Sequence, residues 1–204
     1  MLQQAQLLNI ALHPQDVVYT PDWVAADMVQ FFQPSGRILE PSKGGGVFLK
    51  YLPPETEWCE IAEGVDFFQF TKKVDWIIGN PPFKQVDKFL LHSYSVAENI
   101  VYLLPADKPF NALPRARMIA EYGEIVHMRF YTDGPKAAMR EIHRPVAAFY
   151  FKRGYCGSMS KSFYQERHLT PLALDAGDSP RLPGFSKPEG FTTAEQGSTP
   201  APRQ

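Results

Sequence analysis

The chain has 204 residues, a length that suits one domain with enough apolar surface to bury a core. Its 44% hydrophobic and 21% charged residues exclude a wholly disordered chain, and its formal net charge of −1 gives no overall basic excess that would indicate nucleic acid. The charge is nevertheless uneven, because residues 1–98 carry 7 Lys/Arg and 12 Asp/Glu whereas residues 115–167 carry 10 and 5. This uneven distribution of charge has two alternative explanations: two different ligand surfaces, or ordinary solvated helix faces.

Short apolar runs alternate with segments of helical spacing over the first 170 residues. In chain order the spacing predicts a helix over 21–32, strands over 37–40, 57–61 and 74–79, a helix over 87–97, a strand over 100–104, a helix over 113–122, and strands over 123–131 and 145–152. This alternation predicts an α/β fold in which helices cover both faces of a mostly parallel sheet.

Two connections depart from a regular alternation. The last two strands are separated only by residues 132–144, which contain the turn signal Asp133-Gly134-Pro135, so we expect an antiparallel hairpin at one edge of the sheet. Between Ile61 and Asp66 the chain is too short for a helical crossover. Either a helix and a strand are missing from this edge, or the chain loops back.

The C-terminal segment has a different composition. Residues 171–204 contain six prolines among Gly, Ser and Thr, with almost no apolar periodicity. Such a segment buries too little surface to offset its ordering entropy. We therefore expect a catalytic domain over residues 1–168 and a disordered Pro-rich tail over residues 169–204.

The sequence carries no signal for a metal, a disulfide framework or a membrane. Cys59 and Cys156 stand outside any metal-ligand spacing, and the five histidines show none either. The N-terminus lacks the charged and apolar regions of a signal peptide, and no stretch is apolar enough to span a bilayer. We expect a cytoplasmic protein with no bound metal and no membrane partner.

Glycines gather directly after the first predicted strand, in Glu40-Pro41-Ser42-Lys43-Gly44-Gly45-Gly46. A strand that runs into a Gly-rich turn and then a helix lets backbone N–H groups approach a ligand closely. The spacing is neither that of a dinucleotide-binding loop nor that of a P-loop, and a plain structural turn gives the same pattern. Glu60, at the end of the next strand, stands where an acid accepts from ribose hydroxyls in nucleotide-binding α/β folds. A solvated acid at a strand end is the alternative.

The motif Asn80-Pro81-Pro82-Phe83 follows a fully apolar strand. That strand delivers Asn80 to the carboxyl edge of the sheet, where ligands bind in open α/β folds. Two prolines keep the backbone extended and lack N–H donors, so nearby carbonyls are available to accept from a ligand. With the flat face of Phe83, the motif predicts a site for a planar group that bears an NH₂.

These motifs resemble the amino-group methyltransferases that use S-adenosylmethionine. Their signature is [Asn/Asp/Ser]-Pro-Pro-[Tyr/Phe/Trp], matched by Asn80–Phe83, and the Glu-Pro-x-x-Gly-x-Gly loop precedes it here. Upstream, Tyr19-Thr20-Pro21 resembles the segment that opens N6-adenine DNA methyltransferases. The order of the three motifs matches that group over about residues 17–152. The resemblance implies a Rossmann-like class I methyltransferase fold and S-adenosylmethionine as cofactor.

The resemblance also implies roles for individual residues. The methionine end of the cofactor would lie against Tyr19, Thr20, Pro21, Glu40, Ser42, Gly44 and Gly46, the ribose against Glu60, and the adenine against Asp66 and Phe67. Asn80 and Pro81, followed by Pro82, would accept from the target amino group, and Phe83 would stack on its base. The short 61–65 link departs from the usual family pattern and bears on Asp66. No part of the chain is long enough for the recognition domain that sequence-reading members usually carry.

The resulting hypothesis is methyl transfer to the N6 amino group of adenine in DNA, with Lys136, Arg140 and Arg144 of the predicted hairpin loop contacting phosphates. A solvated loop is the alternative for these three. Three other functions stay open: an RNA base amino-methyltransferase, a protein glutamine-N5 methyltransferase, and a catalytically silent partner subunit that binds nucleic acid. The Tyr-Thr-Pro segment favours DNA over the first two, and the intact Asn-Pro-Pro-Phe motif disfavours the third.

Overall fold

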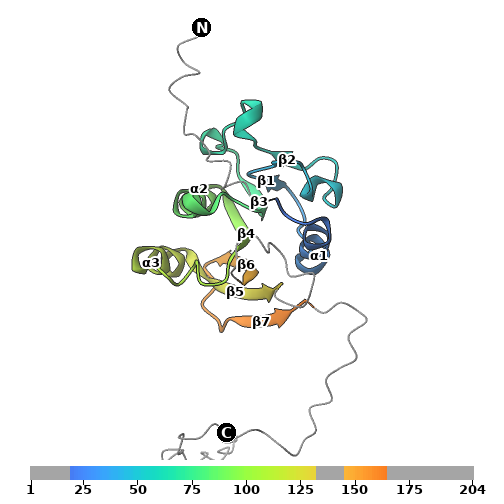
Figure 1. The fold of residues 1–204 in the computed structure, drawn as a ribbon. Helices are drawn as coiled ribbons and strands as arrows, with labels where there is room; N and C mark the ends of the chain where they lie inside the picture. Colours follow the sequence, from blue (N-terminus) through green and yellow to red (C-terminus); the bar gives the residue numbers. More distant parts are fainter. Residues whose placement is uncertain (1–18, 132–144, 165–204) are drawn as a thin grey trace, which may run out of the picture. The chain divides into compact units, whose positions relative to one another are not determined.

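The computed structural model describes residues 19–131 and 145–164 (Figure 1). The chain divides into two units, Met1–Glu166 and Arg167–Gln204, and every described residue lies in the first. The segment predicted to be a disordered tail, residues 169–204, lies outside the described residues.

One mixed sheet organises the described residues (Figure 1). Its strands are β1 (Ile38–Glu40), β2 (Glu57–Trp58), β3 (Val74–Gly79), β4 (Ala97–Pro105), β5 (Gly123–Phe130), β6 (Val146–Arg153) and β7 (Ser160–Phe163). They lie in the order β2-β1-β3-β4-β6-β5-β7. The pairings of β1 with β2 and β3, of β3 with β4, and of β5 with β7 are parallel, whereas β6 is antiparallel to β4 and to β5. Strand β6 is therefore antiparallel to the other described strands of the sheet.

Helices cover both faces of the sheet, as the sequence predicts. Helix α1 (Asp22–Phe32) lies on one face, and α2 (Val86–Val96) and α3 (Leu113–Tyr122) lie on the other (Figure 1). Successive residues of β4 alternate between two cores, as a strand buried on both faces requires. Val101 and Leu103 pack in the core that includes residues of α1, and Tyr102 packs in the core that includes residues of α2 and α3. The α/β prediction is confirmed.

Helix α1 is held to the sheet by a partly buried ion pair. Its apolar residues Val24 and Met28 are fully buried against the sheet. The Asp27 carboxylate accepts from both Nε and Nη2 of Arg129 on β5, at 2.6 and 2.8 Å, and from the Tyr131 hydroxyl at 2.8 Å. A bidentate pair of this kind fixes direction as well as distance. It therefore sets the angle at which α1 crosses the sheet.

The antiparallel pair of β5 and β6 is also present, near one end of the sheet. Two details go beyond the prediction. Strand β6 lies between β4 and β5, and β7, which the apolar pattern does not indicate, pairs outside β5. At the other end, the chain after β2 loops back: the 3-10 helix η3 (Ile61–Glu63) leads to a bridge between Glu60 and Val65. The short 61–65 link is thus a reversal, and β2 forms the described edge.

Candidate functional site

The candidate site lies at the carboxyl ends of β1 and β3, which are parallel neighbours. Leu39 of β1 pairs with Ile77 of β3, so the residues that follow, Glu40-Pro41 and Gly79-Asn80, leave the sheet side by side. A Cβ atom built on Gly79 would lie 3.2 Å from Cδ of Pro41, which is tighter than most Cβ contacts in proteins. Glycine at position 79 therefore permits the two predicted motifs to meet. The Ser42 hydroxyl joins them by donating to the backbone carbonyl of Asn80 at 3.1 Å.

The Gly-rich loop continues the pairing of β1 with β2 beyond the strands themselves. Cys59 N–H donates to the Glu40 carbonyl at 2.8 Å, and Lys43 N–H donates to the Cys59 carbonyl at 2.9 Å. The loop then turns with Gly44 at φ 50° and Gly46 at φ 72°, in the left-handed region that favours glycine. The backbone path thus explains why glycines stand at these two positions.

No α-helix directly follows the Gly-rich loop in the part of the chain that the structure describes. Only a 3-10 turn, η2 (Phe48–Lys50), follows, and the chain reaches Pro53-Pro54 soon afterwards. Prolines lack N–H donors and disfavour helical geometry in the residue before them, so an α-helix has no room to extend. Among the described residues, the loop therefore presents its backbone to the site without a full helix behind it.

Glu60 holds the Gly-rich loop in place. One carboxylate oxygen accepts from Gly44 N–H at 2.7 Å, and the other accepts from Ala62 N–H at 3.1 Å. A carboxylate offers about four lone-pair positions, so these two bonds leave acceptor capacity toward a ligand. The structure therefore places the predicted ribose acceptor against the predicted cofactor loop and gives it a second task, which is to order that loop.

Glu40 is an ionisable group in an apolar place. The residue is 1% exposed, and atom Oε2 is buried with no hydrogen-bond partner among the described residues. Removal from water raises the pKa of Glu40 to about 8, even though nearby Lys43 opposes the shift; the charge of Glu60 adds to it. A buried carboxyl group with an orphaned oxygen fits a cationic ligand, which would supply the missing partner.

The Asn-Pro-Pro-Phe motif leads from β3 into helix α2. Pro81 is buried, and Asn80 and Pro82 are half-buried. Phe83 begins the 3-10 turn η5 (Phe83–Gln85) and packs, partly buried, against both cores. The motif is therefore firmly anchored at both ends, with its backbone at the carboxyl edge where the sequence places it.

Tyr19-Thr20-Pro21 precedes α1 and lies next to the turn that follows the Gly-rich loop. Asp22, the first residue of α1, pairs with Lys50 at 2.8 Å and accepts from the Tyr51 hydroxyl, both at the end of η2. The Pro21 carbonyl accepts the N–H groups of the first turn of α1. Tyr19 is 70% exposed. The structure thus brings this segment beside the loop, and the Tyr19 side chain lies largely in solvent.

Asp66 and Phe67 make mainly intramolecular contacts. Asp66 accepts from Phe68 N–H at 2.9 Å and caps the 3-10 helix η4 (Phe67–Gln69). The Phe67 ring is 3% exposed and stacks on Phe89 of α2, with ring centroids 5.1 Å apart. The ring therefore belongs to the core below the site. Lys136, Arg140 and Arg144 lie outside the described residues, so their predicted phosphate contacts remain a prediction.

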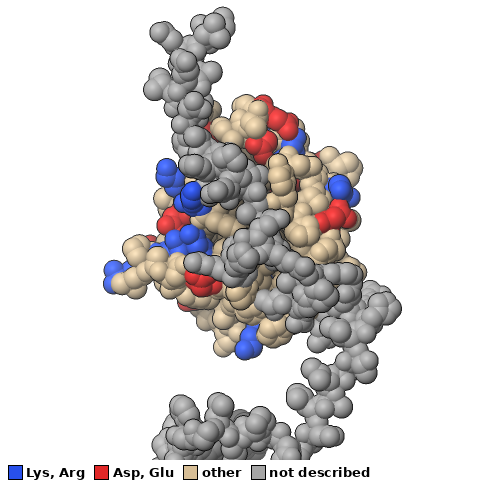
Figure 2. Space-filling view, in the orientation of Figure 1, with Lys and Arg blue, Asp and Glu red and all other residues tan. Residues whose placement is uncertain are grey.

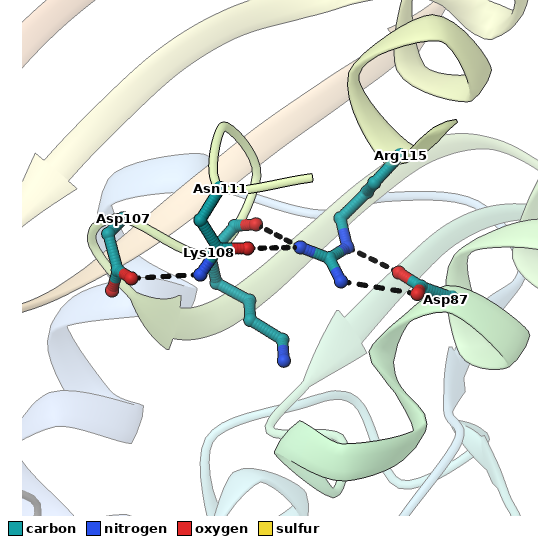
Figure 3. A network of polar contacts seen from close by, with 5 residues as sticks. All are labelled: Asp87, Asp107, Lys108, Asn111 and Arg115. Atoms are coloured by element: carbon teal, nitrogen blue, oxygen red, sulfur yellow. Dashed lines mark hydrogen bonds and ion pairs between the residues drawn. The ribbon is translucent and has the colours of Figure 1, made fainter. Parts of the chain in front are cut away.

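Arg115 is a site-supporting residue that the sequence did not single out (Figure 3). It is buried at the start of α3 and forms a bidentate pair with Asp87 in the first turn of α2, just after the Asn-Pro-Pro-Phe motif. Its Nη1 also donates to the Lys108 carbonyl and to Oδ1 of Asn111, at 2.7 Å for the latter. One guanidinium therefore joins the start of α2 to segment 106–112, which follows β4 at the same edge of the sheet.

No protein-family model matches the chain, and no curated protein matches it. Solved structures share its fold. A protein assigned as a modification subunit of a type I restriction enzyme from Vibrio vulnificus YJ016 superposes with a TM-score of 0.50 at 13% identity, over 82% of this chain and 51% of that one. Thermoplasma acidophilum 1320 gives 0.49 at 14% identity, over 68% and 93%. A Listeria monocytogenes protein assigned to the class I S-adenosylmethionine-dependent methyltransferases gives 0.48 at 13%, over 79% and 71%.

This chain thus spans about half the length of the Vibrio protein. Within residues 19–131 and 145–164, we find no helix with the length and apolarity needed to cross a membrane. In the same residues, no three His, Cys, Asp or Glu side chains lie together as a candidate metal site. The strand order and the likeness to the Vibrio structure show that the described part of the chain has a Rossmann-like α/β fold.

The buried Glu40 generates a prediction about stability and pH. Its folded pKa of about 8 lies above the ordinary value of 4.5, so the folded state holds a proton that the unfolded state releases between these values. The stability due to this proton is complete below the lower value and is lost as pH rises through about 8. Between about pH 6 and 8, we expect the unfolding free energy of the wild type to fall by up to ~2 kcal/mol relative to Glu40→Gln, measured by urea denaturation. An exposed control, Glu55→Gln, should follow the wild type; parallel curves for wild type and Glu40→Gln would contradict the raised pKa.

The Arg115 network generates a second prediction. Arg115→Ala removes the buried guanidinium group together with its hydrogen bonds to Asp87, Lys108 and Asn111. It should lower the unfolding free energy by about 1.5–3 kcal/mol. Arg115→Lys should recover little of this, because an ammonium group cannot form the bidentate pair with Asp87. Arg117→Ala, an exposed change on the same helix, should stay within about 0.5 kcal/mol of the wild type. If denaturant titrations showed equal losses of unfolding free energy for Arg115→Ala and Arg117→Ala, the network would contribute no more to stability than an exposed side chain.

Proposed function

We propose that the chain is an S-adenosylmethionine-dependent methyltransferase that acts on the exocyclic amino group of a nucleic-acid base, first of all N6 of adenine in DNA. The single observation that carries the proposal is the direct link between the two motifs. Ser42 of the Gly-rich loop donates to the backbone of Asn80, and Glu40 of the same loop offers a buried, unsatisfied carboxyl oxygen. A Gly-rich loop with a buried carboxyl group and the Asn-Pro-Pro-Phe motif thus meet at one edge of one sheet.

The residues present fit the proposed cofactor. S-adenosylmethionine carries an ammonium and a sulfonium group, and when bound it supplies a methyl group for transfer. Glu40 would meet the positive charge, the glycines of the loop would admit the ligand close to the backbone, and Glu60 would accept from the ribose hydroxyls. A Rossmann-like class I fold, with its ligand edge at the carboxyl ends of β1 and β3, agrees with this assignment.

Asn80 and Pro81 would have to activate the target amino group, which is a poor nucleophile. The lone pair of an exocyclic amine is conjugated with its ring. Acceptors at Asn80 Oδ1 and at the Pro81 carbonyl would bind the two amino hydrogens and favour a more tetrahedral nitrogen. Its lone pair then points toward the methyl donor, so that orientation and preorganised electrostatics supply most of the rate. A base inside a duplex cannot reach such a motif, which implies that the target is unpaired or flipped out.

The proposed DNA substrate is supported by the Tyr19-Thr20-Pro21 segment and by its position beside the Gly-rich loop, through the pairing of Asp22 with Lys50. A modification subunit of a restriction enzyme is among the structures with this fold, which agrees with DNA. The deciding experiment incubates the protein with methyl-labelled cofactor and separate pools of DNA, RNA and protein. Label in DNA adenine supports the proposal; label only in RNA, only in protein, or in none selects one of the three other functions.

Glu60→Ala should weaken S-adenosylmethionine binding by about tenfold or more, because charge-assisted hydrogen bonds contribute roughly 1.5–3 kcal/mol each. The variant also loses the acceptor that holds Gly44 N–H, so both effects act in the same direction. Titration calorimetry measures the affinity, and Glu55→Ala, an exposed acid before β2, serves as the matched control. Unchanged affinity in folded Glu60→Ala would remove this residue from the cofactor site.

Asn80→Ala should retain cofactor and nucleic-acid binding and lose turnover by about 10²–10³-fold, because the lost acceptor acts chiefly on the transition state. Phe83→Ala should instead weaken capture of the target base, since base stacking contributes roughly 1–3 kcal/mol, and Phe83→Tyr or Phe83→Trp should be tolerated. Single-turnover methylation and equilibrium binding separate the two effects. A wild-type rate for Asn80→Ala at saturating cofactor and substrate would falsify the amino-methyltransferase mechanism.

A further inference from the structure

Basic side chains gather on the face of the molecule that α2 and α3 cover (Figure 2). Lys84 and Lys88 lie at the start of α2 and are exposed, and Lys108 lies in segment 106–112, which leads from β4 to α3. The Arg115 guanidinium binds Asp87, next to Lys88 in the chain, and also the Lys108 carbonyl, so Lys88 and Lys108 belong to one continuous surface. We call Lys84, Lys88, Lys108 and Phe110 the α2–α3 surface.

Helix electrostatics do not account for these charges. Cations stabilise a helix near its C-terminus, where they meet the negative end of the dipole. Lys84 and Lys88 lie at the opposite end of α2, and neither α2 nor α3 has a basic residue in its last turn. The acid next to Lys88 in the chain, Asp87, has both of its carboxylate oxygens engaged by the buried Arg115. The arrangement therefore favours an external anion.

The same surface displays an aromatic ring. Phe110 is 53% exposed, and its described ring contact is an edge-on approach to Phe149, with centroids 6.2 Å apart. Its position is fixed, because Phe110 N–H and Asn111 N–H both donate to the Asp107 carbonyl at 3.0 Å. Arg115 braces Asn111 from the other side. A Phe ring held in water by an ordered segment costs hydrophobic free energy, and a stacking partner would recover it.

Topology brings this surface to the edge where the target amino group would be held. Gly79, the residue before Asn80, pairs with Tyr102 of β4, and β3 and β4 are parallel. Segment 106–112 follows β4 at the edge where Asn80 follows β3. A strand whose base enters at Asn80 would thus have its neighbouring nucleotides close to Lys108 and Phe110.

We propose that the α2–α3 surface binds a single nucleic-acid strand beside the target nucleotide, with Lys88 and Lys108 contacting phosphates and Phe110 stacking on an unpaired neighbouring base. Alternating cations and exposed aromatic rings are the usual means of holding an unpaired strand, because every base has a π-face and every nucleotide a phosphate. The inference rests on the proposed function, since it takes nucleic acid as the substrate. It adds a strand-binding surface formed by described residues, none of which is among Lys136, Arg140 and Arg144.

The test measures binding of the full chain to a short fluorescein-labelled deoxyoligonucleotide, single-stranded and annealed, by anisotropy over a range of salt concentrations. Lys88→Ala/Lys108→Ala should weaken binding about tenfold or more near 0.1 M salt and lower the log–log salt slope by about 1.4–1.8, which corresponds to two phosphate contacts. The matched control, Lys152→Ala/Lys161→Ala, removes the same charge from exposed positions on β6 and β7 and should keep the wild-type slope.

Phe110 is tested by a different signature. Phe110→Leu keeps an apolar side chain beside Phe149 but loses the π-face, so it should weaken single-strand binding by about fivefold or more without changing the salt slope. Phe110→Trp should bind as well as the wild type or better. Leu113→Ala, at another exposed apolar position, should have no effect.

The outcomes separate this inference from the proposed function. Wild-type affinity and slope in Lys88→Ala/Lys108→Ala, or wild-type affinity in Phe110→Leu, overturn the strand-binding surface and leave nucleic-acid methylation standing. If the wild type binds no oligonucleotide at any salt concentration while calorimetry shows intact S-adenosylmethionine binding, the nucleic-acid substrate itself fails, and the surface fails with it.

Discussion

The site depends on a three-residue strand that is buried on both faces. Strand β1 pairs with β2 on one side and β3 on the other, and every residue of it is buried. Buried backbone groups must find partners, so its hydrogen bonds continue past its end, through Cys59 to Glu40 and Lys43. This continuation, and the close approach that Gly79 permits, fix the Gly-rich loop relative to Asn80. The two motifs are 38 residues apart in the chain and become neighbours only through β1.

Two guanidinium groups then fix the helices on either side of this strand. Arg129 holds α1 through Asp27 on one face of the sheet, and Arg115 holds α2 through Asp87 on the other. Planar bidentate pairs resist rotation better than point charges do, so Arg129 fixes the middle of α1 and Arg115 fixes the start of α2 against the rest of the fold. The rigid support lies just behind the site, where preorganisation matters for transfer chemistry.

Much of this arrangement could be predicted from the sequence, and the exceptions have physical reasons. Strands β1, β3 and β4 are apolar runs that end at Pro or Asn motifs, so their carboxyl ends and the edge they share follow from pattern alone, although β4 already begins at Ala97, which the pattern assigned to the preceding helix. Strand β7 has the sequence Ser-Lys-Ser-Phe and owes its existence to pairing with β5 and to Ser160 and Ser162 meeting His127. Such partners leave no periodic signal. Arg115 was equally hidden, because its partner Asp87 lies 28 residues away in the chain.

The position of β6 has a consequence for how the protein is made. Synthesis delivers the N-terminal strands first, yet β4 and β5 share no hydrogen bonds; each pairs with β6, which follows both in the chain. Until residue 153 has left the ribosome, the nascent sheet ends at the apolar edge of β4, with its backbone groups open to other strands. The β4 edge thus stays without its partner from the emergence of residue 105 until residue 153 has followed, and the rate of synthesis over residues 106–153 sets the length of that interval.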